Sequence, residues 1–208
     1  MPPLKFQVLY YPLLQAVDLM LPSYLDNDKA TPNLLSRDFI GYMMALYFGL
    51  EHEDPVALGK VMAANRHIPA DVRKSVISPH VSGDLLSSDF RKPKSEVPEV
   101  TEPVNTTLYE KIAAILVDPL FCPLMADDVS EVAPAFIHAA EFDVLRDDGL
   151  LYTSKLFKAG VRVQGYLSEG GYHSEISSTG RDWLKPDTGL VALRKSFEFM
   201  RSEFDMSD

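Results

Sequence analysis

The chain has 208 residues, of which 46% are hydrophobic and 24% are charged, and its formal net charge is −10. This composition is typical of a globular domain with a sizeable core and excludes a disordered chain. The acidic balance argues against a nucleic-acid-binding surface and against a polybasic membrane-surface patch, because both need clustered basic side chains. Cys122 is the only cysteine, so the chain has no internal disulfide and no thiolate metal cluster, as expected in a reduced compartment.

The chain carries no recognisable targeting segment. Residues 1–5 lead almost directly into an apolar, strand-like segment, without the basic region and long apolar core of a signal peptide. No stretch reaches the roughly 18 apolar residues of a membrane-spanning helix, so we expect no membrane span in this chain. Asn105-Thr106-Thr107 is an N-glycosylation sequon, usable only in the secretory pathway, and such triplets also arise by chance.

The first elements are a strand and a long loop. Residues 6–11 form an apolar run that predicts a buried strand, stopped by Pro12. Residues 13–35 have no sustained periodicity and contain Pro22, so we expect a loop.

Two helices are then expected. Ser36 is suited to cap the first, which Gly49 ends, and Pro55 suits the first position of the second, over residues 55–62. The first helix has an apolar stripe that suits either a core or the lining of an acyl or aryl pocket. The stripe consists of Phe39, Ile40, Met43, Met44, Tyr47 and Phe48.

Residues 78–107 are expected to be the least structured part, because their charged, Pro-rich segment 91–100 is typical of a surface loop.

The last 75 or so residues are more regular. They predict, in order, a strand at 134–140, a helix from Asp147 and Asp148 to Phe157 closed by Gly160, a strand at 161–167, a glycine-bearing loop at 169–173 and a terminal helix through 190–204.

Alternating strands and helices predict an α/β fold with a parallel sheet. Three strands are too few, because parallel sheets are covered on both faces and usually have about four to six strands. We therefore interpret residues 1–208 as one partial domain, the later part of a larger one. Within it, residues from about 20 to 115 are expected to be a helical and loop insertion, and residues 116–208 a strand-helix-strand-helix unit.

Asp143 and His173 each follow one of the last two predicted strands. Functional groups collect beyond the carboxyl ends of parallel strands, so we expect these two side chains to approach one another. The aspartate would then accept a hydrogen bond from the histidine and fix its tautomer, as in a serine-hydrolase triad. The alternative is structural, since an Asp after a strand is often a helix cap and a His in a Gly-rich loop is often merely exposed.

The residues around Asp143 and His173 also carry a family resemblance. Residues 140–152, Lys158-Ala159-Gly160-Val161 and Gly171-Tyr172-His173 resemble the hormone-sensitive-lipase-like α/β hydrolases, in particular the branch of arylacetamide deacetylase and neutral cholesterol ester hydrolase. Residues 119–128, 10–18 and 21–24 are also similar to that branch. The resemblance spans nearly the whole chain and is weakest from about residue 78 to residue 112.

The resemblance implies the C-terminal half of an α/β-hydrolase fold, with Asp143 as the triad acid and His173 as the general base. A Gly-rich oxyanion loop and a Gly-x-Ser-x-Gly elbow belong upstream in this family, and neither occurs in the 208 residues. No nucleophile is therefore assigned in this chain, and we expect it to have no esterase activity alone. The family usually has glycine after the histidine, where this chain has Ser174 and Glu175.

The resemblance also implies a substrate class. It points to small aryl or acyl esters and amides, or lipid esters, with no metal and no organic cofactor. Full-length members of the branch are often anchored in the endoplasmic reticulum membrane. The sequence indicates no oligomeric state.

Two other functions are compatible with an α/β fold. The first is a non-catalytic α/β module that binds a ligand or partner, in which His173 would be vestigial. The second is a nucleotide-binding domain, which needs a Gly-rich strand-to-helix turn that the sequence lacks.

The remaining histidines suit structural or surface positions. The adjacent residues His52, Glu53 and Asp54 cannot all face one ion, so a solvated surface is the better interpretation. We expect His67 and His80 to be structural or exposed, and His138 to be a core histidine within its strand.

Overall fold

The structure is a computed structural model that describes residues 4–29, 35–179 and 187–205. The chain divides into two compact units, one formed by Met1–Leu13 with Asp127–Asp208 and the other by Leu14–Ala126. We refer to them as the sheet unit and the helical unit. The predicted insertion boundaries at about residues 20 and 115 stay a prediction about the family domain.

The sheet unit contains a three-stranded parallel sheet in the order β1-β2-β3, which confirms the predicted parallel α/β arrangement. Gln7 of β1 lies opposite Ala135 of β2, which in turn lies opposite Val163 of β3. The elements of this unit are β1 (Gln7–Tyr10), β2 (Ala135–Phe142), α6 (Arg146–Lys158), β3 (Val163–Tyr172), α7 (Glu175–Ser178) and α8 (Asp187–Asp205).

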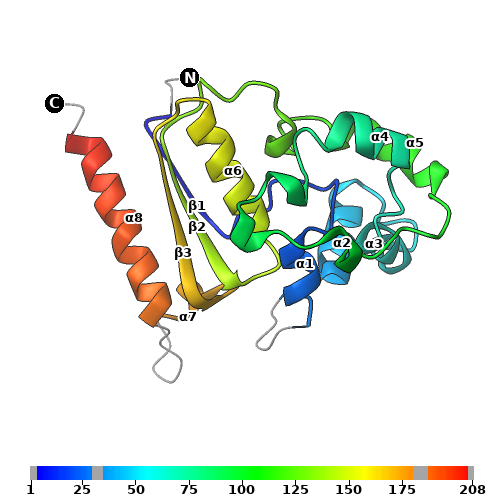
Figure 1. Ribbon diagram of the computed structural model, residues 1–208, viewed down its shortest axis with the longest axis horizontal. Helices are drawn as coiled ribbons and strands as arrows, with labels where there is room; N and C mark the ends of the chain where they lie inside the picture. Colours follow the sequence, from blue (N-terminus) through cyan, green and yellow to red (C-terminus); the bar gives the residue numbers. More distant parts are fainter. Residues whose placement is uncertain (1–3, 30–34, 180–186, 206–208) are drawn as a thin grey trace. The chain divides into compact units, whose positions relative to one another are not determined.

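Helices α6 and α8 cover opposite faces of this sheet (Figure 1). On one face, Gly149 of α6 packs closely on the side chains of Ile137 and Ala139. On the other face, the ring of Phe136 packs against Phe199 of α8, with 6.0 Å between ring centroids. Successive side chains of a strand point to opposite faces, so β2 is buried on both sides and its sequence is apolar without alternation.

The end of β3 differs from the sequence prediction. The strand was expected to end at residue 167 and to be followed by a glycine-bearing loop, but it continues to Tyr172 and includes Gly170 and Gly171. The pairing shifts along this stretch, because Ala140 lies opposite Ser168 whereas Phe142 lies opposite Tyr172. The extra residues of β3 form an irregularity that disrupts the strand alternation, which is why the sequence did not predict it.

The start of α6 agrees with the sequence prediction. Asp147 and Asp148 were expected at the start of this helix, and both lie in its first turn, which begins at Arg146, with Leu145 in the cap position but no side-chain cap. Both aspartates are fully buried in the first turn, where Asp147 pairs with Arg146 at 2.9 Å. Negative charge in a first turn interacts favourably with the helix dipole. The predicted stop is confirmed, since Gly160 has a φ of 77°.

The helical unit contains α1 (Pro22–Asn27), α2 (Arg37–Tyr47), α3 (Pro55–Ala63), α4 (Ala70–Val72) and α5 (Thr106–Leu116), with a π-helical turn at Arg73–Ile77 and 3-10 turns at Gly83–Leu85, Ser88–Phe90, Lys94–Glu96 and Pro123–Met125. The predicted start of α2 is confirmed, because the Ser36 side chain accepts a hydrogen bond from the Phe39 amide. Pro55 is the first residue of α3, as expected. None of the helices in the described ranges has both the length and the apolar character needed to cross a bilayer.

Helices α1, α4 and α5 were not predicted. Pro22 was interpreted as a loop residue, but proline also suits the first position of a helix, and α1 begins there. Helix α5 is capped by the Asn105 side chain of the sequon, which accepts a hydrogen bond from the Leu108 amide. Short helices such as α1 and α4 carry too few turns for a helical period to show in the sequence.

Helices α2 and α3 pack backbone to backbone through two glycines. A Cβ atom added to Gly59 would lie 2.6 Å from the amide nitrogen of Tyr42, and one added to Gly41 would collide with the Gly59 carbonyl oxygen. The apolar stripe of α2 is divided by this packing. Ile40 and Met44 are buried in the core, whereas Phe39, Met43 and Tyr47 are exposed.

We predict that Gly59→Ala destabilises the helical unit by about 1–3 kcal/mol, because the added methyl group meets rigid backbone rather than a side chain that can move. Thermal unfolding followed by circular dichroism measures the effect. Gly83→Ala is the matched control, since its Cβ would meet only Pro22 side-chain atoms at 3.5 Å or more. Equal melting temperatures for the two variants would contradict the close helix contact.

His67 is a buried structural histidine, as expected. It is 0% exposed, and its Nε2 lies 2.8 Å from the Ala16 carbonyl oxygen. Burial lowers the pKa of His67 to about 4, the hydrogen bond to Ala16 opposes this shift, and the positive charge of Arg73 adds to it. His67 is therefore neutral at pH 7.

We predict that His67 makes the protein acid-sensitive. Its unfolded form, with a pKa near 6.5, binds a proton before the folded form does, so stability falls as the pH drops from about 6.5 to about 4, by up to about 3 kcal/mol. Urea unfolding across this range in His67→Gln should show a flatter profile. His52→Gln is the control, because that side chain is 92% exposed; identical profiles for all three proteins would refute the assignment.

Candidate functional site

Three polar side chains follow the three strands of the sheet. Tyr11, Asp143 and His173 come directly after β1, β2 and β3. Because the strands are parallel, their carboxyl ends share one edge of the sheet, and in open α/β sheets this edge is where ligands bind. The structure therefore places both residues predicted from the sequence, Asp143 and His173, at the same edge.

The side chains of Asp143 and His173 are joined by a hydrogen bond. The Nδ1 atom of His173 lies 2.9 Å from Oδ2 of Asp143, while Oδ1 of the same carboxylate accepts a hydrogen bond from the Leu145 amide at 3.0 Å. The side chain of Asp143 is 1% exposed and that of His173 is 23% exposed. A buried carboxylate fixed at both oxygens holds the proton on Nδ1, which leaves Nε2 as the basic nitrogen. Among the described residues, none hydrogen-bonds to Nε2.

The turn that carries His173 has an unusual backbone. Ser174, the next residue, has a φ of 66°, in the left-handed region that favours glycine. Before the turn, Gly170 has a φ of 72°, and its amide donates to Oε2 of Glu141 at 2.7 Å. The turn thus links β3 to α7 with a serine where a residue without a β-carbon fits best.

Tyr11 lines the same edge and was not predicted as a site residue. Its ring centroid lies 5.2 Å from that of His173, and its hydroxyl accepts a hydrogen bond from the Ile176 amide at 3.0 Å. Partial burial raises the pKa of Tyr11 well above its usual value. The hydrogen bond from Ile176 opposes this shift, whereas the negative charges of Glu175 and Asp143 add to it. Tyr11 therefore stays a neutral phenol that supports the His173 turn.

Next to the turn lies a buried polar cluster that consists of His138, Ser168, Glu175 and Thr188. Nε2 of His138 lies 2.9 Å from Oγ of Ser168 and 3.1 Å from Oε1 of Glu175. Ser168 donates to the same Oε1 at 2.5 Å, and Thr188 donates to Oε2. Burial by itself raises the pKa of Glu175, but the hydrogen bonds from His138, Ser168 and Thr188 outweigh it and hold the pKa below its usual value.

This cluster is not a second triad. In a triad, the nucleophile and the acid bind opposite nitrogens of the imidazole, whereas here Ser168 and Glu175 share Nε2. Both His138 and Ser168 are also 0% exposed, so no substrate reaches them. The prediction that His138 is a core histidine is confirmed. The sequence signalled Glu175 only as a departure from the expected glycine pattern, and nothing in it pointed to Ser168 or Thr188 as partners.

The other polar candidates belong to the helical unit. His52 is exposed and lies 3.6 Å from its neighbour Glu51, and His80 is half-buried in the helical unit. Within the ranges that the structure describes, no group of three or more His, Cys, Asp and Glu side chains is arranged to hold a metal ion.

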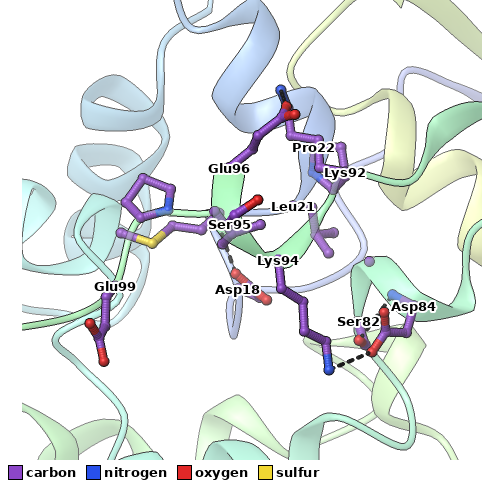
Figure 2. Close-up of a pocket in the computed structure, with 14 residues that line it drawn as sticks. Asp18, Leu21, Pro22, Ser82, Asp84, Lys92, Lys94, Ser95, Glu96 and Glu99 are labelled. Atoms are coloured by element: carbon purple, nitrogen blue, oxygen red, sulfur yellow. Dashed lines mark hydrogen bonds and ion pairs between the residues drawn. The ribbon is translucent and has the colours of Figure 1, made fainter.

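The helical unit has a hollow of about 720 Å³ of its own, shown in Figure 2. Both lysines around it are paired: Lys94 lies 3.7 Å from Asp84, and Lys92 pairs with Asp26 at 2.6 Å. Asp18, which also lines the hollow, accepts hydrogen bonds from Met20 and Asn65. None of the residues of the α2 stripe lines this hollow.

Comparison with protein families identifies the fold. A family model described as the alpha/beta hydrolase fold matches residues 61–177, more than half of the chain. Among solved structures, the thermostable carboxylesterase EstE1 from a metagenomic library superposes with a TM-score of 0.54 and 20% identity, over 96% of this chain and 45% of that one. At this identity the superposition supports the fold alone.

Curated relatives confirm the predicted branch. The chain is 32% identical to arylacetamide deacetylase of Oryctolagus cuniculus over 95% of its own length and 46% of the relative's. It is 33% identical to human arylacetamide deacetylase-like 4, over 85% of this chain and 42% of that one. It is 34% identical to neutral cholesterol ester hydrolase 1 of Pongo abelii, over 86% of this chain and 42% of that one.

The chain thus spans less than half the length of these relatives. The parallel strand order, the residues at the strand ends and the family match all indicate the same fold. The chain belongs to the α/β hydrolase fold family and resembles its arylacetamide deacetylase and neutral cholesterol ester hydrolase branch.

Proposed function

We propose that this chain supplies the acid and the base of a serine-type carboxylic-ester hydrolase. The observation that carries the proposal is the 2.9 Å contact between Nδ1 of His173 and a buried carboxylate oxygen of Asp143. In the proposed mechanism, Nε2 of His173 removes the proton of a serine hydroxyl, and Asp143 stabilises the imidazolium that forms. His173 later returns this proton to the leaving group.

The proposal assigns the nucleophile to residues outside these 208. The sequence contains neither a Gly-x-Ser-x-Gly elbow nor a Gly-rich oxyanion loop. Without a serine no acyl-enzyme forms, and loss of a triad costs on the order of 10⁶ in rate. The absence of an oxyanion-hole donor by itself lowers the rate by roughly 10²–10³-fold. On this basis the chain alone is inactive.

The proposed substrates are small aryl or acyl esters and amides, or lipid esters. Support comes from the relatives, whose names describe an arylacetamide deacetylase and a neutral cholesterol ester hydrolase. A triad needs neither a metal nor an organic cofactor. We further propose the endoplasmic reticulum membrane as the location of a full-length protein, on the family resemblance alone.

We predict that the purified 208-residue chain neither hydrolyses p-nitrophenyl acetate above the buffer rate nor reacts with a fluorophosphonate probe. The reason is that no activated serine is present. A longer product of the same gene that includes the upstream coding region should react with the probe. Absence of labelling in that longer protein, once shown to be folded, would favour the rival function, a non-catalytic binding module.

In the longer protein, we predict that Asp143→Asn lowers kcat by up to about 10⁴-fold, because the amide favours the wrong tautomer of His173. His173→Ala should abolish fluorophosphonate labelling. His52→Ala is the matched control, since His52 is on the surface of the helical unit and should leave kcat unchanged. Full activity in Asp143→Asn would contradict the assigned acid.

Ser174 provides a separate prediction about the turn. We predict that Ser174→Gly raises the free energy of unfolding by about 0.5–1 kcal/mol, because glycine adopts a positive φ without strain. Ser174→Ala is the control, since alanine keeps the β-carbon and the strain at a φ of 66°. Urea unfolding should separate the two variants; equal stabilities would show that the turn is not strained.

A further inference from the structure

We propose that Glu175 and His138 are positioning residues for His173. In this proposal the buried carboxylate of Glu175 ties the His173 turn to the sheet and to α8, and so holds the imidazole against Asp143. The structural part of the proposal concerns the geometry of His173 in this chain and stands by itself, whereas its consequence for catalysis rests on the proposed function.

The carboxylate of Glu175 contacts three different elements. Oε1 lies 3.1 Å from His138 on β2 and 2.5 Å from Ser168 on β3, and Oε2 accepts a hydrogen bond from Thr188 on α8. Glu175 is 0% exposed, although it lies only two positions after His173. A surface turn is thereby anchored by a side chain that reaches into the interior.

The anchor and the catalytic contact use the same strand. His138 lies within β2, and Asp143 directly follows β2. The turn is therefore held to one strand at two points, by His138 through Glu175 and by Asp143 through His173 itself. Movement of Glu175 out of its site would shift the backbone that carries the imidazole.

The residues around Glu175 pack closely against it, as expected for a side chain that anchors the His173 turn. Gly171 packs so closely on Ser168 and Glu175 that a β-carbon there would lie 2.8 Å from both carboxylate oxygens of Glu175. A Cβ on Gly189 of α8 would likewise lie 2.9 Å from the Glu175 carbonyl oxygen. Within the described residues, Nδ1 of His138 has no hydrogen-bond partner. Its imidazole therefore makes its polar contacts through Nε2, toward Ser168 and Glu175.

The test is the tautomer of His173, measured by ¹⁵N NMR of the 208-residue chain labelled at histidine. The signals are assigned by their loss in His173→Asn. We expect the parent to show one dominant form, protonated at Nδ1. In Glu175→Ala we expect a mixture of the two neutral tautomers, because the imidazole is no longer held against Asp143.

The matched control is Glu203→Gln. Glu203 is also a buried carboxylate, and it pairs at 2.9 Å with Arg162, which precedes β3, at the opposite end of the strand from His173. We expect this variant to lose stability without any change in the His173 signals. A tautomer change in Glu203→Gln as large as in Glu175→Ala would overturn the proposal, because the effect would then come from general loosening.

Thr188→Val is a milder second variant, which decides the matter if Glu175→Ala does not fold. It removes one donor to Glu175 and keeps the branched shape of a half-buried side chain. We expect a smaller tautomer change in the same direction. Unchanged His173 signals in Thr188→Val, together with unchanged signals in any folded Glu175→Ala, would refute the positioning role.

Kinetics of the longer protein distinguish this proposal from the proposed function. There we expect Glu175→Ala to lower kcat by up to on the order of 100-fold with little change in KM, because a misplaced base affects the chemical step. A changed tautomer in a longer protein that has no esterase activity would support the positioning role and reject the hydrolase. An unchanged kcat in Glu175→Ala would show that Glu175 does not position His173 for the chemical step.

Discussion

The architecture of the site depends on the parallel alignment of three strands. Because β1, β2 and β3 run in the same direction, residues far apart in the sequence come together at one edge of the sheet. Asp143 reaches His173 across neighbouring strand ends, and a buried carboxylate can fix an imidazole only if its own position is fixed. The Leu145 amide does this, since it binds the second oxygen of Asp143. The start of α6 thereby contributes to the geometry of the site.

The sequence predicted the parts of the fold that rest on strong local patterns. The apolar run of β2, the Ser36 cap of α2, the Pro55 start of α3 and the glycine stop at Gly160 each follow from one residue type in a suitable position. The approach of Asp143 and His173 followed from the order of the elements alone. The roles of these two residues in a reaction remain a proposal, which the geometry supports.

The features that the sequence did not predict depend on tertiary contacts. The extension of β3 through Gly170 and Gly171 exists because an irregular pairing with β2 accommodates extra residues. Helix α1 begins at a proline that equally suits a loop, and the role of Glu175 depends on donors from three separate elements. No pattern along the chain reveals such partners, because they meet only after the chain has folded.

The buried cluster around Glu175 also constrains which sequences this fold tolerates. A buried carboxylate in that position is strongly destabilising unless its donors are present, and a histidine inside an apolar strand is also destabilising, although less so, unless a polar partner faces it. Either residue introduced alone would destabilise the fold, and the presence of the other offsets part of that cost. The residue identities at positions 138 and 175 are therefore coupled, and close homologues should keep or lose the two side chains together.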